Sequence, residues 1–205
     1  HVLNKFPNNP VNPFVERGEG IFVFTEDGRK FLDATAGWCS QMVLGYNQVE
    51  VLNAMNDQMA RFCHMDHNIW RHREMEELAS LLLSRAPSGL NKVYFAGNSG
   101  SESVEAALKL SYQVHYDSGN KDKVYVISRN QSYHGSTLQC LAVSERDNLK
   151  FYNQLLPHTI ARIPQHHPLH MMKSKETIDE YAKRSANELE IQILELGPNC
   201  VGSFI

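Results

Sequence analysis

Two polar stretches of this chain carry the residues best suited to bind a ligand, and the first is Ser99-Gly100-Ser101-Glu102. It follows a short apolar run and leads into a segment with helical spacing. Ser99 and Glu102 fit the capping-box pattern S-x-x-E, which places the start of a helix at Gly100. The first amides of a helix have no carbonyl partner within it, and the helix dipole favours negative charge there. The stretch therefore predicts a site for a phosphate or a carboxylate.

The second stretch runs from Gln131 to Thr137 and includes Tyr133, His134 and Ser136. It offers an aromatic ring on which a planar ligand could stack, an imidazole and several hydroxyls. The plainer interpretation is a polar loop whose side chains bond to the local backbone. The chain has no G-x-G-x-x-G motif, and no Lys-Ser/Thr pair follows the second glycine as a P-loop requires. A phosphate ligand other than a nucleoside triphosphate is therefore favoured.

The elements around the two stretches are expected to bring them together. Residues 93–96 and 124–128 are apolar runs rich in strand-forming residues, and a helix is predicted between them from Gly100. A strand, a helix and a strand of this length predict a right-handed βαβ unit with parallel strands. Parallel strands end at the same edge of a sheet, where ligands of α/β proteins bind. The loop after Ser128 should therefore lie beside Gly100 and Ser101.

The rest of the chain predicts further elements of the same class. Residues 1–18, rich in Pro and Asn, are expected to be irregular, and Asp27-Gly28 predicts a hairpin between 20–24 and 30–32. Apolar spacing predicts helices over 49–62, 74–83 and 174–196, and strands over 158–163 and 201–205. The order of elements predicts an α/β fold with a mainly parallel sheet flanked by helices.

Composition excludes several classes of function. The chain has 205 residues and a net charge of −3, which gives no basic surface for nucleic acid. It has no run of 18 apolar residues that could span a membrane, and its start lacks an apolar signal core. Its four scattered cysteines suit reduced thiols, so a cytoplasmic location is expected. No metal is expected at either of two groups of histidines. His64 and His67 lack the third ligand and set geometry that a zinc site needs, and His166, His167 and His170 lack a Cys or carboxylate framework.

Several motifs together resemble the N-terminal half of the class III aminotransferases, which are pyridoxal-phosphate enzymes of fold type I. The likeness is greatest to the branch that acts on ω-amino acids or on amine and pyruvate, and it runs from about Asn12 to Ile205. Two motifs at matching spacing carry it, with smaller ones before them: residues 99–105 and 133–137, then Gly18-Glu19-Gly20, Asp27-Gly28, Asp33, Gly37-Trp38-Cys39 and Leu44-Gly45-Tyr46.

The resemblance implies roles for single residues. Gly100 and Ser101 would bind the phosphate of pyridoxal 5'-phosphate with Ser99 nearby, Tyr133 would stack on the pyridine ring, and His134 would support that loop. Trp38 resembles an aromatic residue that lines the substrate pocket. Residues 46–205 would be the first, incomplete part of the large cofactor-binding domain of fold type I. Residues 1–45 would be the N-terminal segment of a smaller α+β domain, and the protein would be a homodimer.

The implied reaction moves an amino group from an amine or ω-amino acid to a keto acid such as pyruvate. It needs a lysine that forms a Schiff base with the cofactor. No lysine here has the matching context, so no catalytic residue is assigned. The chain is expected to be a piece of a longer enzyme and inactive alone.

Two alternatives stay open. One is decarboxylase, aminomutase or racemase chemistry on the same cofactor. The other is a non-catalytic half-length protein that binds a phosphate ligand or a partner subunit.

Overall fold

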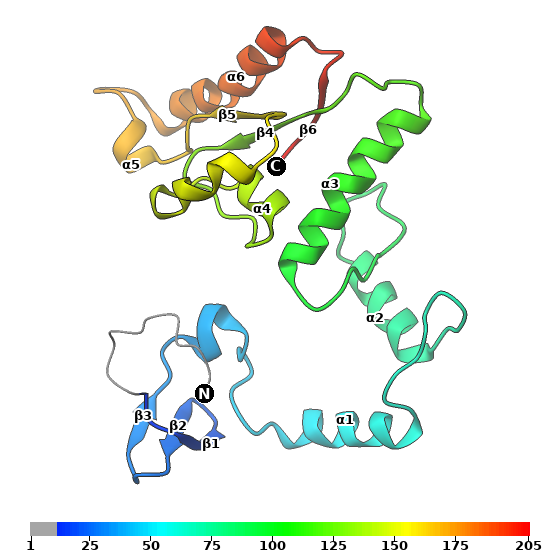
Figure 1. Cartoon of the computed structure of the whole chain (residues 1–205). Helices are drawn as coiled ribbons and strands as arrows, with labels where there is room; N and C mark the ends of the chain where they lie inside the picture. The colour runs from blue at the N-terminus through cyan, green and yellow to red at the C-terminus, as the bar shows by residue number, and fades with distance from the viewer. Residues whose placement is uncertain (1–11) are drawn as a thin grey trace. The chain divides into compact units, whose positions relative to one another are not determined.

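The computed structural model describes residues 12–205, apart from the side chain of Asn148, and shows two compact units (Figure 1). The first unit extends to Leu81 and the second begins at Leu82. Each unit has its own sheet, antiparallel in the first and parallel in the second. The domain boundary expected between residues 45 and 46 stays a prediction.

The first unit contains a three-stranded antiparallel sheet in the order β1-β2-β3. β2 (Phe22–Thr25) and β3 (Lys30–Leu32) form the predicted hairpin, and Gly28 in its turn has a φ of 84°. β1 (Val15–Glu19) pairs with β2, so the expectation of irregular structure up to residue 18 is wrong for this part. The hairpin edge satisfies the backbone of β1, which outweighs the local signal of the prolines before it. Residues 1–11 lie outside the described residues.

Two helices follow in sequence, and both were predicted to within a residue. α1 spans Val49–Arg61 and α2 spans Arg73–Leu83. Regular apolar spacing over three turns is the pattern that best predicts a helix. In the described part of the chain, no helix is both long and apolar enough to cross a membrane.

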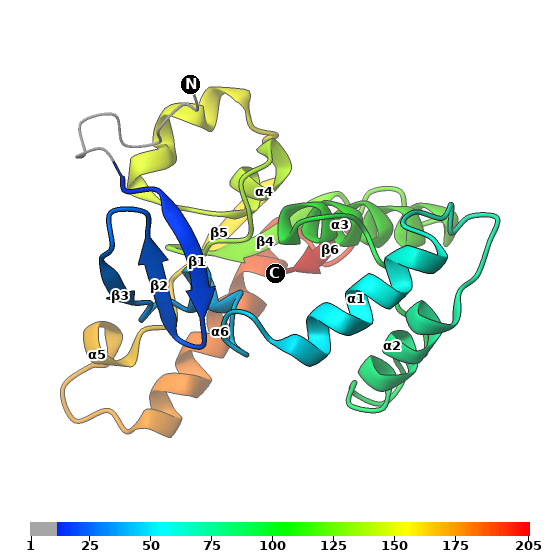
Figure 2. The same ribbon diagram turned by 90° about the horizontal axis from the view of Figure 1, so that it is seen from below.

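The second unit is built on a parallel sheet in the order β5-β4-β6, with strands β4 (Tyr125–Arg129), β5 (Ile160–Ile163) and β6 (Val201–Phe204). Arg129 on β4 bonds to α6 (Ile178–Leu196), whereas Arg162 on β5 bonds to the end of α4 (Leu138–Val143). The two helices therefore cover opposite faces of the sheet, and α3 (Gly100–Asp117) contacts α4 and β6 (Figure 1 and Figure 2). The predicted parallel α/β architecture is confirmed.

The core of the second unit lies on both faces of β4. Its fully buried side chains come from the strands and from the two covering helices: Ile127, Ser128, Cys140, Val143, Ile163 and Tyr181. A 3-10 helix (Asp147–Leu155) and the short α5 (Pro168–Met171) complete the unit. The sheet and its helices fix where the strands end, and the polar loops begin there.

One predicted strand of this unit does not form, and one predicted helix starts later than expected. Residues 93–96 form no strand, and Tyr94 is 72% exposed, because no described segment pairs with their backbone. A strand exists only through the ladder it makes with a neighbour, which an apolar run does not by itself provide. The predicted βαβ unit therefore lacks its first strand. α6 starts at Ile178 rather than Ser174, because Thr177 and Glu180 form a capping box there.

Candidate active site

The first turn of α3 has the geometry of a capped helix start. Ser99 has extended backbone angles, and its Oγ accepts the amide hydrogen of Glu102 at 3.3 Å. The carboxylate of Glu102 turns back to accept the amide hydrogen of Asn98 at 2.7 Å. The helix therefore begins at Gly100, as the capping-box pattern predicted.

The amides at this helix start are available to a ligand. Those of Gly100 and Ser101 belong to the first turn, so no carbonyl of the helix can accept from them. A methyl group placed on Gly100 would meet no atom within 4 Å, so the space beside its Cα is open. Open space, free N–H groups and the positive end of a helix dipole are what an anion needs.

The loop after β4 lies against this first turn. The amide of Ser136 donates to Ser101 Oγ at 3.0 Å, and the Cys140 thiol donates to the Ser101 carbonyl at 3.3 Å. Gly135 passes so close that a Cβ there would lie 2.5 Å from Ser101 Oγ, and its φ is 138°. The expected meeting of the two polar stretches is confirmed by these contacts.

Tyr133 presents its ring from the same loop. Its hydroxyl shares a hydrogen bond of 2.9 Å with Ser136 Oγ, and the guanidinium of Arg146 lies 4.4 Å from its ring centroid. The residue is 52% exposed. The ring is thus held at its hydroxyl and by a cation–π contact, with half of its surface left for a planar partner.

His134 anchors the loop through its backbone rather than its ring. Its amide donates to Ser144 Oγ at 2.8 Å, whereas its Nε2 is buried and has no partner among the described residues. Burial lowers the pKa of His134 from its usual 6.5, and the nearby positive charge of Arg162 lowers it further. The imidazole is therefore neutral at pH 7, and its Nε2 can donate or accept one hydrogen bond according to the tautomer.

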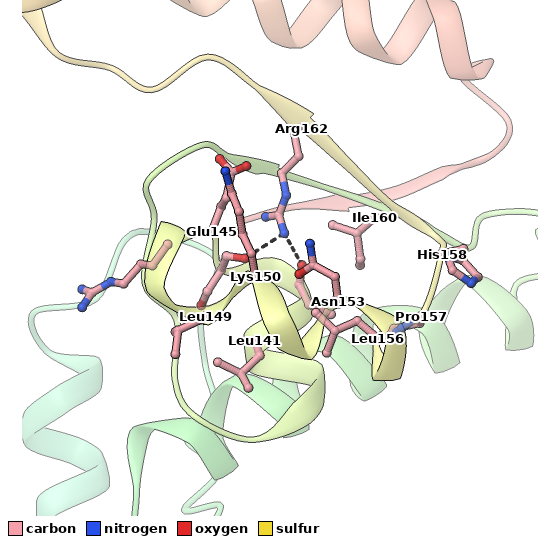
Figure 3. Close-up of a pocket in the computed structure, with 13 residues that line it drawn as sticks. Leu141, Glu145, Leu149, Lys150, Asn153, Leu156, Pro157, His158, Ile160 and Arg162 are labelled. Atoms are coloured by element: carbon pink, nitrogen blue, oxygen red, sulfur yellow. Dashed lines mark hydrogen bonds between the residues drawn. The ribbon is translucent and has the colours of Figure 1, made fainter. Parts of the chain in front are cut away.

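Behind the loop, the guanidinium of Arg162 holds the end of α4 (Figure 3). Arg162 lies beside Ser128 in the parallel register and donates to its hydroxyl. Its Nη atoms also donate to the carbonyls of Ala142, of Val143 at 2.9 Å and of Ser144 at 2.8 Å. Sequence reasoning missed Arg162 and Ser144. A charged residue between Ala161 and Ile163 of an apolar strand was the signal that could have found Arg162.

Arg162 also borders a cavity of about 240 Å³ between α4, the 3-10 helix and β5 (Figure 3). Leucines and Ile160 line it, together with Glu145, Lys150 and Asn153. Lys150 makes an ion pair with Asp147 at 2.8 Å. Two cations of the lining are therefore engaged, Lys150 by Asp147 outside the cavity and Arg162 by the end of α4.

Trp38 belongs to the first unit, whereas the residues above belong to the second. It lies in a turn, Ala36–Ser40, whose five residues have φ values of 49°, 70°, 71°, 51° and 62°. The carboxylate of Asp33 holds the turn, accepting from the Tyr46 hydroxyl and the Gly37 amide, each at 2.6 Å. Hydrogen bonds from Tyr46 and then Thr35 keep the pKa of Asp33 well below its usual range.

The turn stores strain around an exposed aromatic side chain. Four non-glycine residues in left-handed backbone are unfavourable and persist only where surrounding contacts impose them. Trp38 itself is 70% exposed. Among residues 12–205, no three His, Cys, Asp or Glu side chains lie close enough to hold a metal ion.

A sequence profile described as Aminotransferase class-III matches residues 5–201. The chain belongs to the class-III aminotransferases. It is 37% identical over 194 residues to an uncharacterized aminotransferase of Schizosaccharomyces pombe, covering 94% of this chain and 42% of that relative. It is 34% identical over 200 residues to gamma-aminobutyrate transaminase 1, mitochondrial, of Oryza sativa subsp. japonica, covering 95% of this chain and 38% of the relative.

Solved structures agree with the family assignment. The omega transaminase of Pseudomonas jessenii in complex with PMP superposes with a TM-score of 0.85 at 29% identity, covering 94% of this chain and 42% of that one. The PMP-bound aminotransferase of Vibrio fluvialis gives 0.85 at 25% identity with the same coverage. The predicted fold type I class is confirmed by this likeness. This class-III aminotransferase chain spans about two fifths of the length of the proteins it matches.

Proposed function

We propose that the whole protein is a pyridoxal-phosphate-dependent aminotransferase that moves an amino group from an amine or ω-amino acid to a keto acid such as pyruvate. The observation that carries this proposal is the contact between Ser136 and Ser101, which joins an open helix start to a loop with a half-exposed ring. Membership of the class-III aminotransferases supports the same reaction, and relatives named omega transaminase and gamma-aminobutyrate transaminase support an ω-amino donor.

The residues present fit a phosphate joined to a flat ring. The amides of Gly100 and Ser101 would bind the phosphate, for which the open space at Gly100 leaves room. Ser101 Oγ accepts from Ser136 and keeps its own proton to donate to a phosphate oxygen, with Ser99 beside it. Tyr133 would stack on the pyridine ring, and the unpartnered Nε2 of neutral His134 could bond to a further group.

When bound, pyridoxal phosphate supplies an electron sink that lets an amino group leave one carbon and be delivered to another. The role of this chain is to bind the phosphate and to orient the pyridine ring against Tyr133. It also shields the ring from water. We propose that Trp38 lines the substrate pocket, because an exposed aromatic in a turn imposed by Asp33 is preorganised for contact.

The phosphate site is tested by changing the charge at Gly100. Gly100→Asp fits the open space, and an acidic residue in the first turn stabilises a helix, so folding should be preserved. Its negative charge would oppose a phosphate, and we expect the dissociation constant for pyridoxal phosphate to rise about tenfold or more, ~1.4 kcal/mol, relative to Gly100→Asn. Titration of the cofactor-free complete protein by absorbance measures this. Equal affinity of the two variants would exclude phosphate binding at this helix.

The reaction is tested with the complete protein and a panel of amines and ω-amino acids. We expect product aldehyde or ketone, and alanine, only when pyruvate or another keto acid is supplied. Carbon dioxide or a rearranged amino acid formed without a keto acid would favour decarboxylase or aminomutase chemistry. Cofactor binding without any turnover would favour a non-catalytic role.

We also propose a homodimer in the cytoplasm. The homodimer is implied by the family resemblance, and light scattering on the complete protein measures it. The location is expected from the scattered cysteines, although some relatives are named mitochondrial or chloroplastic. A fluorescent fusion of the complete protein would decide the compartment.

A further inference from the structure

The last carbonyls of α4 are satisfied by an arginine from a neighbouring strand. A helix leaves its final carbonyls without partners, and α4 ends at Val143. Ser144 serves two of them, because its amide donates to Leu141 and its hydroxyl donates to Cys140 at 2.7 Å. The next two, on Ala142 and Val143, accept from Arg162. Arg162 is therefore the cap that completes this helix end.

The capped helix end also supports the cofactor-binding loop, residues 131–137. Ser144 accepts Arg162 on its carbonyl and the His134 amide on its Oγ. Two residues beyond His134, Ser136 donates to Ser101 at the start of α3. A continuous path of hydrogen bonds and short backbone segments thus runs from the guanidinium to the loop and on to the helix start.

We propose that Arg162 is a positioning residue for the cofactor-binding loop, acting through the end of α4 and Ser144 on the backbone of His134. The inference rests on the proposed function for its link to the cofactor, but the link from Arg162 to the loop stands on the structure alone. Without the guanidinium, the Ala142 carbonyl would lose its partner and the Val143 carbonyl would keep only the Ser132 hydroxyl at 3.3 Å, so the end of α4 would relax toward solvent. The loop would then lose its fixed place beside Ser101.

The matched control is Arg129, one strand away. It is also partly buried and donates to main-chain oxygens, those of Pro164 at 2.8 Å and Ser185 at 3.4 Å. The contacts of its guanidinium lie on the other face of the sheet, against α6, and do not lead to the loop. Its main-chain carbonyl accepts from Ser132 in the loop, but a side-chain substitution leaves that carbonyl in place. Arg162→Met and Arg129→Met each remove a guanidinium of the same sheet while keeping an apolar stem, so a general loss of stability should affect both.

The first measurement is hydrogen exchange in the cofactor-free complete protein, well below its unfolding temperature. We expect the loop around His134 and Ser136 to exchange about tenfold faster in Arg162→Met, and unchanged in Arg129→Met. The second is the dissociation constant of pyridoxal phosphate, which should rise about tenfold in Arg162→Met alone. Loop exchange equal in the two variants would overturn the proposal.

A double-mutant cycle tests the route. Ser144→Ala removes the acceptor of the His134 amide, so its effect on loop exchange should overlap with that of Arg162→Met. Fully additive effects of the pair would contradict a shared path. If the unmodified protein binds no pyridoxal phosphate, the proposed function fails, while the exchange experiment still decides the role of Arg162.

Discussion

At Gly135, the loop after β4 passes so close to α3 that no residue with a side chain would fit there. A Cβ there would lie 2.5 Å from Ser101 Oγ and 2.9 Å from Cβ of Cys140, and the φ of 138° is itself unfavourable for other residues. We expect Gly135→Ala to separate the loop from Ser101 and to weaken pyridoxal phosphate binding about tenfold.

Gly119→Ala is the control, because Gly119 also has a positive φ, 84°, but has open space where a Cβ would be. It should cost only the backbone term of about 1–2 kcal/mol in urea unfolding and leave cofactor affinity unchanged. Cofactor affinity that survives in Gly135→Ala would show that the close approach is not needed for binding.

At the same scale, the sequence predicted the residues whose signals are local. Ser99 and Glu102 lie three positions apart, so the cap between them could be predicted from spacing alone. Arg162 could not be connected to Ser144 or Ala142 in this way, because 18 and 20 residues separate them and the contact depends on the register of β5 beside β4. The role of Asp33 in holding the turn around Trp38 was missed for the same reason, since Tyr46 lies 13 residues away.

Among the elements, α6 is tied to the segment before it by a carboxylate. Both oxygens of Glu176 accept from Arg184, at 2.7 and 2.8 Å, and one accepts the Lys173 amide. These bonds, that of Arg184 first, lower the pKa of Glu176 from 4.5 to about 2. The group therefore stabilises the fold above pH 4.5 and loses this contribution as the pH falls toward 2.

We expect the unfolding temperature of the unmodified protein to exceed that of Glu176→Gln at pH 6, and the difference to shrink below pH 4.5. Glu190→Gln, an exposed position of the same helix, serves as the comparison and should show a smaller change. A difference that stays constant from pH 6 to pH 3 would contradict the assigned ion pair.

Whether an element could be predicted depended on whether its backbone hydrogen bonds close within one segment. The helices α1, α2 and α3 follow from apolar spacing within one segment. Strands depend on a neighbour, so residues 93–96, which are rich in strand-forming residues as β4 is, lack a ladder, while β1 gains one from β2. A single sequence contains the propensity of a strand but not the identity of its partner.

For the whole molecule, much apolar surface of the described chain lies in contact with solvent. On α3 alone, Leu110 is 58% and Val114 54% exposed, and α1 and α2 carry further large apolar side chains. Surface of this kind marks an interaction face or a tendency to aggregate. We expect the 205-residue segment, expressed alone, to self-associate in size-exclusion chromatography and to show no turnover.

The complete protein should elute as a single defined species and turn over with pyruvate, so the two samples form a matched pair. Monomeric behaviour of the segment at micromolar concentration would contradict the expected self-association. Multiple turnovers by a segment of verified mass would contradict the expectation that the segment is inactive alone.

The hydrogen bonds of the Arg162 guanidinium also affect how well the cavity beside it can bind small molecules. All four of its Nη hydrogens are engaged by Ser128 and by three carbonyls. A map of electrostatic potential would colour the adjoining cavity positive and invite acidic fragments into it. Such fragments would find a charge with few hydrogens left to offer, and would have to displace the end of α4 to reach it. Compound screening is better aimed at the open amides of Gly100 and Ser101, where the donors are uncommitted.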